Sequence, residues 1–469
     1  MSILFEYGNR ETFKNRVELE KVVQDIWQTR KTNVENPELS MEDSEQSEEE
    51  PDPKYQPFLR FDGENVSAKN YVGFIQNGED IIEIYPKVFR EQFQKQETIS
   101  KENKQLMLRH IFYWFKYCRK WKFPFNQASL GNIDIDEFPE LIINLIANQF
   151  LETVSNQPLM MYQAVEESLV VPRGSINFKR YISKSLSYGN FQNIECDYEP
   201  FLFDNKVNRL IKFCSRLLMN HTKFPESFRV LQEVVFILDE VEDVYCTIHD
   251  LESITLNSFF SEYSILLDSC KLILNQQLYA NNSYDLTQWC LLFPMEYIFE
   301  DFVAGFLEDK FSRDWKVDYQ KSDMYLSEDP EAFNMQHDIF LTSRQKPERK
   351  VIIDTKYKLR PKDFKNDIKK GIAQSDLYQM VSYAFKRGCT DVLLIYPNIS
   401  DKLNLADTFI INSGFNGEGE IKVTAIEIPF YSLNNFENLD LIMYKVIEEQ
   451  LNSHKKIITT EPNLMGGND

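Results

Sequence analysis

The sequence lacks the short motifs that mark several large enzyme classes. It contains no GxSxG of a serine hydrolase, no GxGxxG of a dinucleotide-binding fold and no GxxxxGK[ST] of a nucleotide-binding loop. Its seven cysteines include no CxxC, and its five histidines include no HExxH. We therefore expect neither a zinc site nor a disulfide framework, and any nucleotide hydrolysis would have to come from another chain.

Long apolar runs are also missing. No run reaches about 18 residues, the length that a membrane-spanning helix needs. The start of the chain, MSILFEYGNR, has no basic segment followed by an apolar one, as a secretion signal would. We expect a soluble, cytoplasmic protein that makes no contact with a membrane.

Positive charge is scarce over the chain as a whole. The 469 residues include 73 acidic and 52 basic side chains, a net charge of −21, which argues against a uniformly basic nucleic-acid coat. Hydrophobic residues make up 43% of the chain, enough for two or three domains with their own cores. The 36 Phe and 23 Tyr are interpreted as packing of these cores.

The periodicity of the sequence predicts an α+β protein of several domains. Residues 1–95 read as a β-rich, partner-binding module, because YVGFIQ and DIIEIYPKVF flank the turn NGE. Residues 96–285 read as a mainly helical middle domain, with helical periodicity at 105–123, 139–165, 205–220 and 257–278 and a short β-segment at 167–178. Residues 286–469 alternate strands with helices, among them a helix from about 373 to 387 that Gly388 would stop, and predict an α/β domain with a mixed sheet.

An acidic segment interrupts the first module. Residues 35–54 read ENPELSMEDSEQSEEEPDPK, with almost nothing to bury. This composition predicts a disordered insertion. An acidic segment that mimics DNA or binds a partner is the alternative.

The segment VIIDTKYKLR, residues 351–360, carries the strongest chemical signal. Asp354 and Lys356 are two positions apart and would share one face of a strand. An acidic residue two positions before a lysine recurs in this chain on segments that read as surface, so the pattern alone is weak. What sets this pair apart is the apolar strand before it, which would anchor both side chains on a rigid element.

A second aspartate points to the same place. Asp338 begins DIFLTS, and a hairpin folded about Lys346 would set Asp338 opposite Asp354. Directly opposed side chains on paired strands have Cβ atoms about 4.5–5.5 Å apart, so the two carboxylates could bind one Mg²⁺. Lys356 could then orient or help to deprotonate an attacking water. The sequence therefore predicts a metal site at a strand end.

Further polar residues could complete this site. Gln379 and Tyr383 are four apart on a predicted helix and share a face with Asp376, although an ordinary polar helix edge explains them too. Glu300 or Glu296, on the preceding helix, could add an acidic ligand, or could lie on a solvated helix face.

The same region is locally basic. Residues 344–370 hold eleven Lys or Arg against four acids, which suits a polyanion such as DNA. Arg344, Lys358 and Arg360 are the predicted DNA contacts. An exposed lysine-rich loop with no ligand is the alternative.

Several of these segments resemble a known family. HDIFL, VIIDTKYK and QMVSY are similar to the core of the PD-(D/E)xK nucleases and to the QxxxY helix of their RecB-like members. With YVGFIQNGEDIIEIYPKVF, VPRGSINF, EPFLFDNKVNRLIK and YIFEDFV, they follow the order of McrC-type subunits of McrBC and LlaJI-like restriction systems. His337 stands where many PD-(D/E)xK enzymes have Pro, and we interpret it as incidental rather than as a phosphate contact.

The resemblance implies a Mg²⁺-dependent endonuclease subunit of a type IV, McrBC-like phage-defence complex, cutting double-stranded DNA with a separate AAA+ GTPase of the McrB type. In that family the N-terminal β-rich and helical parts dock on the AAA+ ring and stimulate its GTPase. The catalytic roles carry over onto Asp338, Asp354 and Lys356, with Glu300, Gln379 and Tyr383 as additions. A subunit that mainly activates the ring, and a stand-alone RecB-like nuclease, are the alternatives.

Overall fold

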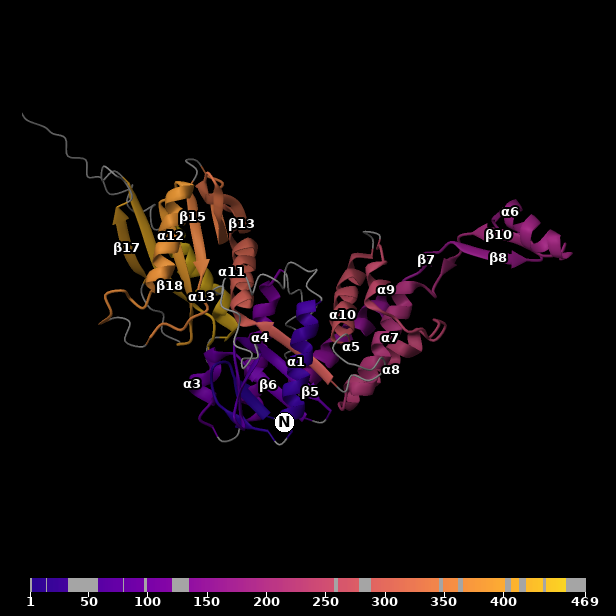
Figure 1. Ribbon diagram of the computed structural model, residues 1–469, viewed down its shortest axis with the longest axis horizontal. Coiled ribbons are helices and arrows are strands. Elements are labelled where there is room, and N and C mark those ends of the chain that lie inside the picture. The colour runs from indigo at the N-terminus through magenta and orange to yellow at the C-terminus, as the bar shows by residue number, and fades with distance from the viewer. Residues whose placement is uncertain are drawn as a thin grey trace, which may run out of the picture.

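A computed structural model gives the structure of the chain and describes most of it. The described residues are 2–13, 15–32, 58–78, 80–96, 99–119, 135–256, 260–277, 288–345, 349–361, 366–400, 406–412, 419–432 and 436–452. The predicted acidic insertion at 35–54 lies outside them. Figure 1 shows a body of N-terminal strands, a C-terminal sheet on one side of it, and a helical region on the other side that carries a protruding arm.

The N-terminal body is built on a four-stranded sheet. Its order is β1-β6-β5-β12, from β1 (Ser2–Phe5), β6 (Asp80–Tyr85), β5 (Tyr71–Asn77) and β12 (Gln288–Pro294). The predicted hairpin is confirmed, because Asn77 pairs with Asp80 across a turn in which Gly78 has a φ of 61°. Beside the sheet lie α1 (Arg16–Thr32) and a three-stranded sheet of β2 (Glu11–Thr12), β4 (Asn65–Ala68) and β3 (Leu59–Asp62).

The strand β12 enters this sheet from far along the chain. It pairs antiparallel with β5 over its whole length, from Gln288 opposite Asn77 to Pro294 opposite Tyr71. Gly73 of β5 makes this approach possible, since a Cβ there would lie 1.9 Å from the carbonyl oxygen of Leu291. The domain boundaries drawn from the sequence remain predictions, and β12, which follows the boundary at 285, hydrogen-bonds to the first module.

The helical region follows the short elements η1 (Lys87–Phe89) and α3 (Arg90–Phe93). Its helices are α4 (Lys101–Tyr117), α5 (Phe138–Asn156), α7 (Lys206–His221), α8 (Pro225–Ile237), α9 (Ile248–Glu252) and α10 (Ser261–Gln277). The helical periodicity of the sequence found four of these, and α8, which starts at a proline, was not among them. A proline in the first turn is favourable because that N–H has no partner within the helix.

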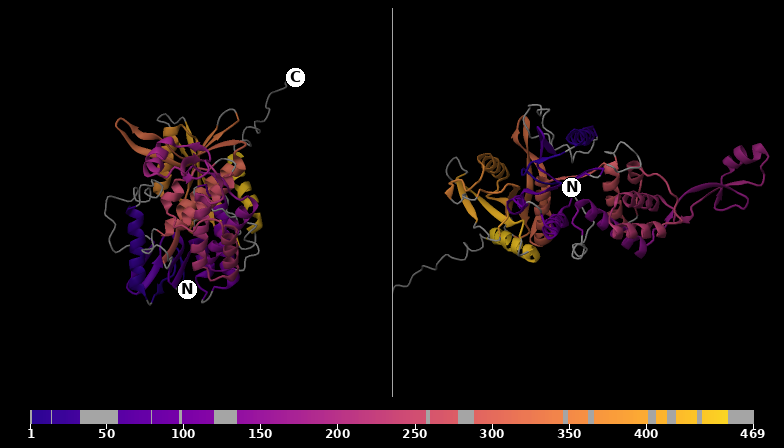
Figure 2. Two further views of the ribbon diagram at one scale, coloured as in Figure 1. Left: turned by 90° about the vertical axis from the view of Figure 1, so that its right-hand side faces the viewer. Right: turned by 90° about the horizontal axis from the view of Figure 1, so that it is seen from below.

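The arm is larger than the β-segment expected at 167–178. It consists of β7 (Met161–Tyr162), β8 (Val165–Leu169), β9 (Ser175–Ile176), α6 (Phe178–Arg180), the helical turns η3 (Tyr181–Ser185) and η4 (Leu186–Tyr188), β10 (Ile194–Tyr198) and β11 (Phe201–Leu202). It leaves the helical region through the two-stranded β7–β11 ribbon and ends in the β8-β10-β9 sheet. Two views at right angles show it projecting away from the rest of the molecule (Figures 1 and 2).

The C-terminal sheet has six strands in the order β13-β14-β15-β16-β18-β17. They are β13 (Trp315–Glu328), β14 (Glu331–Ser343), β15 (Lys350–Thr355), β16 (Asp391–Asn398), β18 (Glu420–Pro429) and β17 (Asp407–Asn412). β16 runs parallel to β15 and β18, and the other pairings are antiparallel. The predicted mixed sheet is therefore confirmed.

Helices cover both faces of this sheet. On one side α12 (Gln374–Arg387) packs on Phe340, Ile352 and Val392. On the other side α11 (Met295–Phe311) and α13 (Leu439–Asn452), preceded by η7 (Phe436–Asn438), pack on Ile339 and Ile353. β15 is thus buried on both faces, which explains its continuous apolar run. α12 ends at Gly388 in the left-handed conformation, as its sequence predicted.

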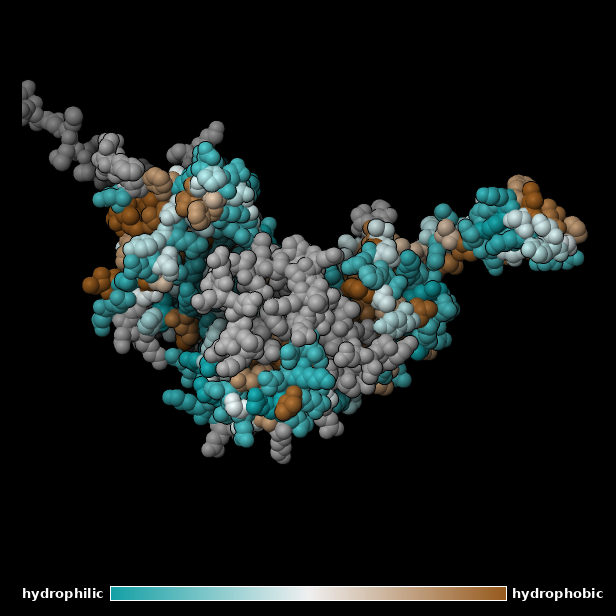
Figure 3. Space-filling model, in the orientation of Figure 1, coloured by the Kyte–Doolittle hydropathy of each residue, from teal (hydrophilic) through white to brown (hydrophobic). Residues whose placement is uncertain are grey.

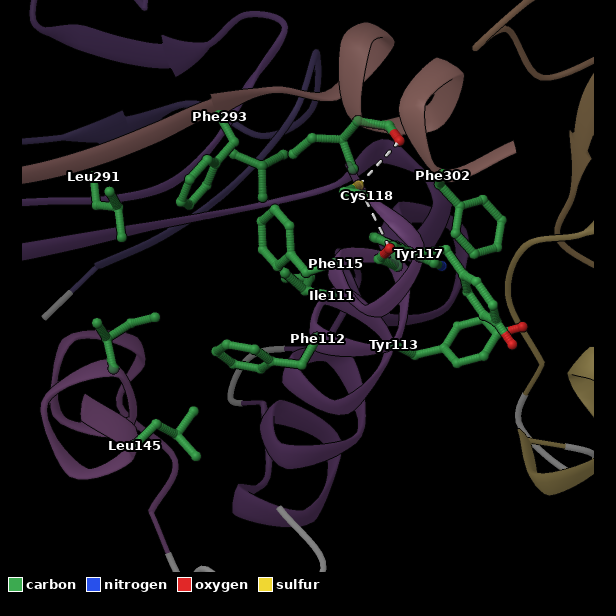
Figure 4. Close-up of a cluster of buried hydrophobic side chains, with 14 of the residues drawn as sticks. Ile111, Phe112, Tyr113, Phe115, Tyr117, Cys118, Leu145, Leu291, Phe293 and Phe302 are labelled. Carbon is green, nitrogen blue, oxygen red and sulfur yellow. Dashed lines mark hydrogen bonds between the residues drawn. The ribbon is translucent and has the colours of Figure 1, made fainter. Parts of the chain in front are cut away.

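Helix α4 joins the parts of the molecule. Its aromatic side chains contact β12, α5 and α11, represented in Figure 4 by Phe293, Leu145 and Phe302. Trp114 stacks on Phe430 with ring centroids 4.0 Å apart and donates a hydrogen bond to the Phe430 carbonyl at 2.9 Å. The abundance of aromatic residues therefore serves core packing. In the part of the chain that the structure describes, no helix is long and apolar enough to cross a bilayer.

A buried carboxyl group in this core generates a prediction about pH. Glu83 is fully buried and accepts a hydrogen bond from the backbone N–H of Phe138 at 2.7 Å. Burial raises its pKa from 4.5 to about 7, although the hydrogen bond from Phe138 opposes the shift. The folded state therefore holds the proton of Glu83 more tightly than the unfolded state does. This contribution to the free energy of unfolding is present below the unfolded pKa and is lost as the pH rises through 7.

Glu83→Gln should remove this loss. Between pH 5 and pH 8 we expect the free energy of unfolding of the variant to gain about 2 kcal/mol relative to the wild type, measured by thermal or urea unfolding. The exposed Glu240→Gln is the control and should show no such trend. A Glu83→Gln variant that follows the wild-type pH profile would contradict the prediction.

Candidate active site

The pairing of β14 with β15 sets the geometry of the site. Ile339 pairs with Ile353 and Phe340 with Ile352. The next step of this register sets Asp338 against Asp354, so the register predicted from the sequence is confirmed. The tip of the connecting turn, residues 346–348, lies outside the described residues.

Asp338 is fixed by the residue that follows Asp354. Its Oδ2 atom accepts two hydrogen bonds, both at 2.8 Å, from the backbone N–H and the side-chain hydroxyl of Thr355. Two donors from the neighbouring strand fix the orientation of the carboxylate. Sequence reasoning missed Thr355, because nothing in its type or spacing distinguishes it from other threonines.

Asp354 is buried beside Lys356. The Lys356 Nζ atom lies 2.9 Å from Oδ2 and 3.2 Å from Oδ1 of Asp354. Only the Oδ1 contact has hydrogen-bond geometry, which leaves the buried Oδ2 with an ion pair and no hydrogen bond. Burial and then the Asp338 charge raise the pKa of Asp354 to about 7, against the opposing effect of Lys356. One lysine thus does not balance the two carboxylates, and a cation would be favourable here.

The charge state of Lys356 bears on its role. Burial lowers the pKa of its amine, but the charges of Asp354 and Asp338 outweigh burial and raise it above the usual value. The group is therefore an ammonium at neutral pH. An ammonium can orient a water molecule or stabilise negative charge, whereas it cannot accept a proton.

The two glutamates of α11 face different surroundings. Glu300 accepts a hydrogen bond from Gln320 at 3.3 Å, and it raises the pKa of Tyr319, second to burial and together with Asp338. Glu296 instead acts electrostatically on Glu6 and Lys87 of the N-terminal body. Of the two predicted candidates, Glu300 is thus the one on the side of Asp338.

The carboxylates suit a hard cation with few protein ligands. Within the described ranges, no group of three or more His, Cys, Asp or Glu is arranged to hold a metal ion. Mg²⁺ is usually bound through one or two carboxylates, with water and substrate phosphate filling the other positions. Asp338 and Asp354, with an Asp354 oxygen that lacks a hydrogen bond, fit this requirement.

Helix α12 brings further residues near the site. The Nε2 atom of Gln379 donates to the Tyr383 hydroxyl at 3.2 Å, and the Tyr383 ring packs on His337 with centroids 4.8 Å apart. His337 is fully buried, which favours the interpretation of it as incidental over a phosphate contact. Asp376 is buried too, and its charge adds to the raised pKa of Asp354.

Tyr396 of β16 is a second residue that the sequence did not single out. It is 2% exposed, and its hydroxyl has no hydrogen-bond partner among the residues that the structure describes. Burial, and then the charges of Asp376 and Asp354, raise the pKa of Tyr396 to about 12. It is therefore a neutral phenol next to the carboxylates. No local pattern marks it, since it lies within the apolar run of β16.

The three predicted DNA contacts differ in accessibility. Lys358 is exposed and lies 3.5 Å from Asp376, and Arg344 is exposed with its Nε donating to the Ser312 carbonyl at 2.9 Å. The side chain of Arg360 is only 1% exposed and pairs with Asp407 at 2.6 Å and Glu427 at 3.5 Å. The prediction for Arg360 is corrected, because burial between two carboxylates commits it to holding its loop on the sheet.

Comparison with known protein families finds one that matches most of the chain. A family described as McrBC 5-methylcytosine restriction system component matches residues 66–397, more than half of the chain. The chain belongs to this McrBC family. The family resemblance seen in the sequence is thereby confirmed. No curated protein sequence matches it.

Solved structures with similar folds come from the same system. One is the refined half-complex from a tetradecameric assembly of Thermococcus gammatolerans McrB AAA+ hexamers with bound McrC. It matches with a TM-score of 0.65 and 14% identity over 95% of this McrBC-family chain and 99% of the other. A second is the cryo-EM structure of the Thermococcus gammatolerans McrBC complex, with a TM-score of 0.47 and 16% identity over 65% of this chain and 86% of that one. The first likeness supports the fold.

The role of Thr355 can be tested directly. Thr355→Val removes the hydroxyl that holds Asp338 and keeps the backbone donor. Loss of a group that orients a metal ligand typically costs about 10- to 100-fold in affinity, so we expect Mg²⁺ binding to weaken by about tenfold or more. A titration of Mg²⁺ followed by the shift in melting temperature would measure it. Thr355→Ser keeps the hydroxyl and should bind Mg²⁺ as the wild type does; equal binding by the valine variant would exclude the role.

Proposed function

We propose that this chain is the Mg²⁺-dependent DNA endonuclease subunit of a McrBC-type restriction complex, hydrolysing phosphodiester bonds with a GTP-hydrolysing AAA+ partner. The observation that carries the proposal is the register of β14 and β15, which brings Asp338 next to Asp354 at a strand end, with the Lys356 ammonium 2.9 Å from Asp354. Membership of the McrBC family supports the restriction system, and the matched fold supports the subunit type.

Asp338 and Asp354 would hold the metal ion, with Glu300 as a further acidic group on the same side. When bound, Mg²⁺ polarises the scissile phosphate and lowers the pKa of a coordinated water. Thr355 keeps the Asp338 carboxylate in place. The Lys356 ammonium donates hydrogen bonds and stabilises the negative charge that grows on the phosphate oxygens. Tyr396 and Asp376 line the same side of the sheet.

The positive charge that DNA needs is local. Exposed Lys358 and Arg344 belong to the basic segment at 344–370, in a chain whose overall charge is −21. Binding should therefore weaken steeply as salt is raised, because each phosphate contact releases condensed counterions. A double-stranded substrate and a cytoplasmic site of action fit a restriction complex.

The cleavage assay tests the nuclease function. Asp338→Ala, Asp354→Ala and Lys356→Ala should each lower Mg²⁺-dependent plasmid cleavage by about a hundredfold or more, since each removes charge that acts on the reacting phosphate. The chain is assayed with its AAA+ partner and GTP, and the melting temperature of each variant checks its fold.

A surface lysine in the same sequence pattern is the matched control. Lys316 stands two residues after Asp314, is 61% exposed and pairs with Asp318. Lys316→Ala should cleave like the wild type. Full activity in any of the three site variants would remove that residue from the mechanism, and full activity in all three would end the proposal.

The arm is our candidate for contact with the AAA+ partner. Its exposed apolar side chains include Tyr162, Val170, Val171, Phe178, Ile182, Tyr188, Phe191 and Phe201. Figure 3 shows hydrophobic atoms gathered at the far end of the arm. Soluble proteins rarely leave large apolar patches uncovered, and such patches mark sites of protein contact. The matched structure contains AAA+ hexamers with bound McrC, which supports a ring as the partner.

Charged substitutions on the arm should uncouple the partner. Phe178→Asp and Ile182→Asp, at side chains 66% and 57% exposed, should weaken stimulation of the partner's GTPase by about tenfold or more without changing the melting temperature. GTP hydrolysis by the AAA+ partner with increasing amounts of each variant measures this. Phe236→Asp, at a phenylalanine of α8 that is 78% exposed, should leave stimulation unchanged. If both arm variants stimulate the partner's GTPase as the wild type does, the arm is not the surface that contacts the partner.

A further inference from the structure

A buried ion pair from the N-terminal body meets the chain directly after Lys356. Glu6 follows β1, and Lys87 opens η1. The Lys87 Nζ atom donates a hydrogen bond to the Tyr357 carbonyl oxygen at 2.7 Å and lies 3.6 Å from Oε1 of Glu6. It also stands 4.0 Å from the centre of the Tyr357 ring, a cation–π distance.

Glu6 completes the contact from the other side. Its Oε2 atom accepts hydrogen bonds from the Tyr357 hydroxyl at 3.2 Å and from the backbone N–H of Lys87 at 3.1 Å. Glu6 is fully buried and Tyr357 is 3% exposed. We call the contact among Glu6, Lys87 and Tyr357 the Lys87 bridge.

The Lys87 bridge is not an arrangement that favours the stability of the folded chain. Burial raises the pKa of Glu6 and lowers that of Lys87, and each charge only partly offsets the shift of the other. Buried ion pairs often contribute less to stability than apolar side chains of the same volume. Glu296 and Lys358 add further charges around Lys87. A role in positioning accounts for such a cluster better than a role in stability.

The segment that the bridge holds is irregular and depends on side-chain contacts, among them the ion pairs of Arg360 and the packing of the Tyr357 ring on Phe430. β15 ends at Thr355, and the Lys356 backbone N–H donates to the Ile395 carbonyl at 2.9 Å. In the described residues after Lys356, no strand or helix forms up to Pro361. The direction in which the chain leaves the strand therefore depends on such contacts. The Lys87 bridge is the one that acts directly after Lys356, because it holds the carbonyl oxygen and the side chain of Tyr357.

We propose that Lys87 is a positioning residue of the nuclease centre, and that the Lys87 bridge makes cleavage depend on the docked N-terminal body. The inference rests on the proposed nuclease function. Because the bridge grips the peptide next to Lys356, a small movement of β1 or η1 shifts the Lys356 ammonium relative to Asp354. The N-terminal body thereby helps to set the geometry of the active site.

Lys87→Met tests the proposal, because it removes the ammonium and keeps the aliphatic stem. Misplacement of a reacting group by about 1 Å can cost about a hundredfold, so we expect kcat for DNA cleavage to fall by about tenfold or more. KM for DNA and stimulation of the partner's GTPase should stay unchanged, because the Lys87 side chain is only 15% exposed and its ammonium is engaged by Glu6 and Tyr357. The measurement uses the complex with its AAA+ partner at saturating Mg²⁺ and GTP.

Lys104→Met is the matched control. Lys104 also forms an ion pair with a fully buried glutamate, since its Nζ atom lies 4.0 Å from Glu83. The exposed fraction of the Lys104 side chain is 12%, and that of Lys87 is 15%. Lys104→Met should lose a similar amount of stability and keep the wild-type kcat. If kcat falls equally in both variants, loss of stability explains the effect of Lys87→Met, and the proposal is overturned.

Two further outcomes decide the matter. If Lys87→Met does not fold, Tyr357→Phe removes the hydrogen bond to Glu6 and should lower kcat with KM unchanged; a wild-type kcat would then overturn the proposal. If the wild-type complex cleaves DNA and the Lys87→Met complex cleaves it with the same kcat, this inference is overturned and the nuclease function is not. A wild-type complex that does not cleave overturns the nuclease function, and the inference with it.

Discussion

The register between β14 and β15 is the constraint on which the candidate site depends. Side chains alternate along a strand, so a slip of one residue would turn Asp354 to the opposite face and separate it from Asp338. The slip is prevented because both faces of β15 are buried, with Ile352 packed toward α12 and Ile353 toward α11 and α13. The apolar residues that stabilise the sheet thus also decide where the carboxylates lie.

Helix α4 extends this order to the rest of the molecule. Its aromatic residues lie in one continuous core with residues of the N-terminal sheet, the helical region and the C-terminal sheet. Two of its tyrosines, Tyr113 and Tyr117, donate hydrogen bonds to Asp440 of α13 at 2.7 and 2.6 Å. Aromatic packing and buried polar contacts together hold the N-terminal body against the C-terminal sheet. The Lys87 bridge depends on this rigid attachment, because its hydrogen bonds form only at short distances.

Local sequence signals predicted the parts of the fold that depend on neighbouring residues. Asn77 and Gly78 marked the first hairpin, Gly388 marked the end of α12, and the run Val351–Ile353 marked the buried strand. The opposition of Asp338 and Asp354 followed from the symmetry of one turn. In each case the physical cause lies within a few residues of the feature.

Contacts between distant segments could not be predicted in this way. The burial of Arg360 depends on Asp407 and Glu427, far along the chain, and the basic segment around it gave no sign of them. The support of Asp338 by Thr355 depends on a backbone N–H, which every residue but proline carries. The pairing of β12 with β5 joins segments some two hundred residues apart, and no periodicity encodes such a pairing.

This last pairing has a consequence for synthesis on the ribosome. The four-stranded N-terminal sheet lacks one of its strands until residues 288–294 have been translated. Domains usually fold in the order in which they are made. Here the helical region and its arm leave the ribosome before the first sheet can close, so β5 must keep its edge unpaired meanwhile. The N-terminal sheet thus reaches its final structure only after the helical region and its arm have been made.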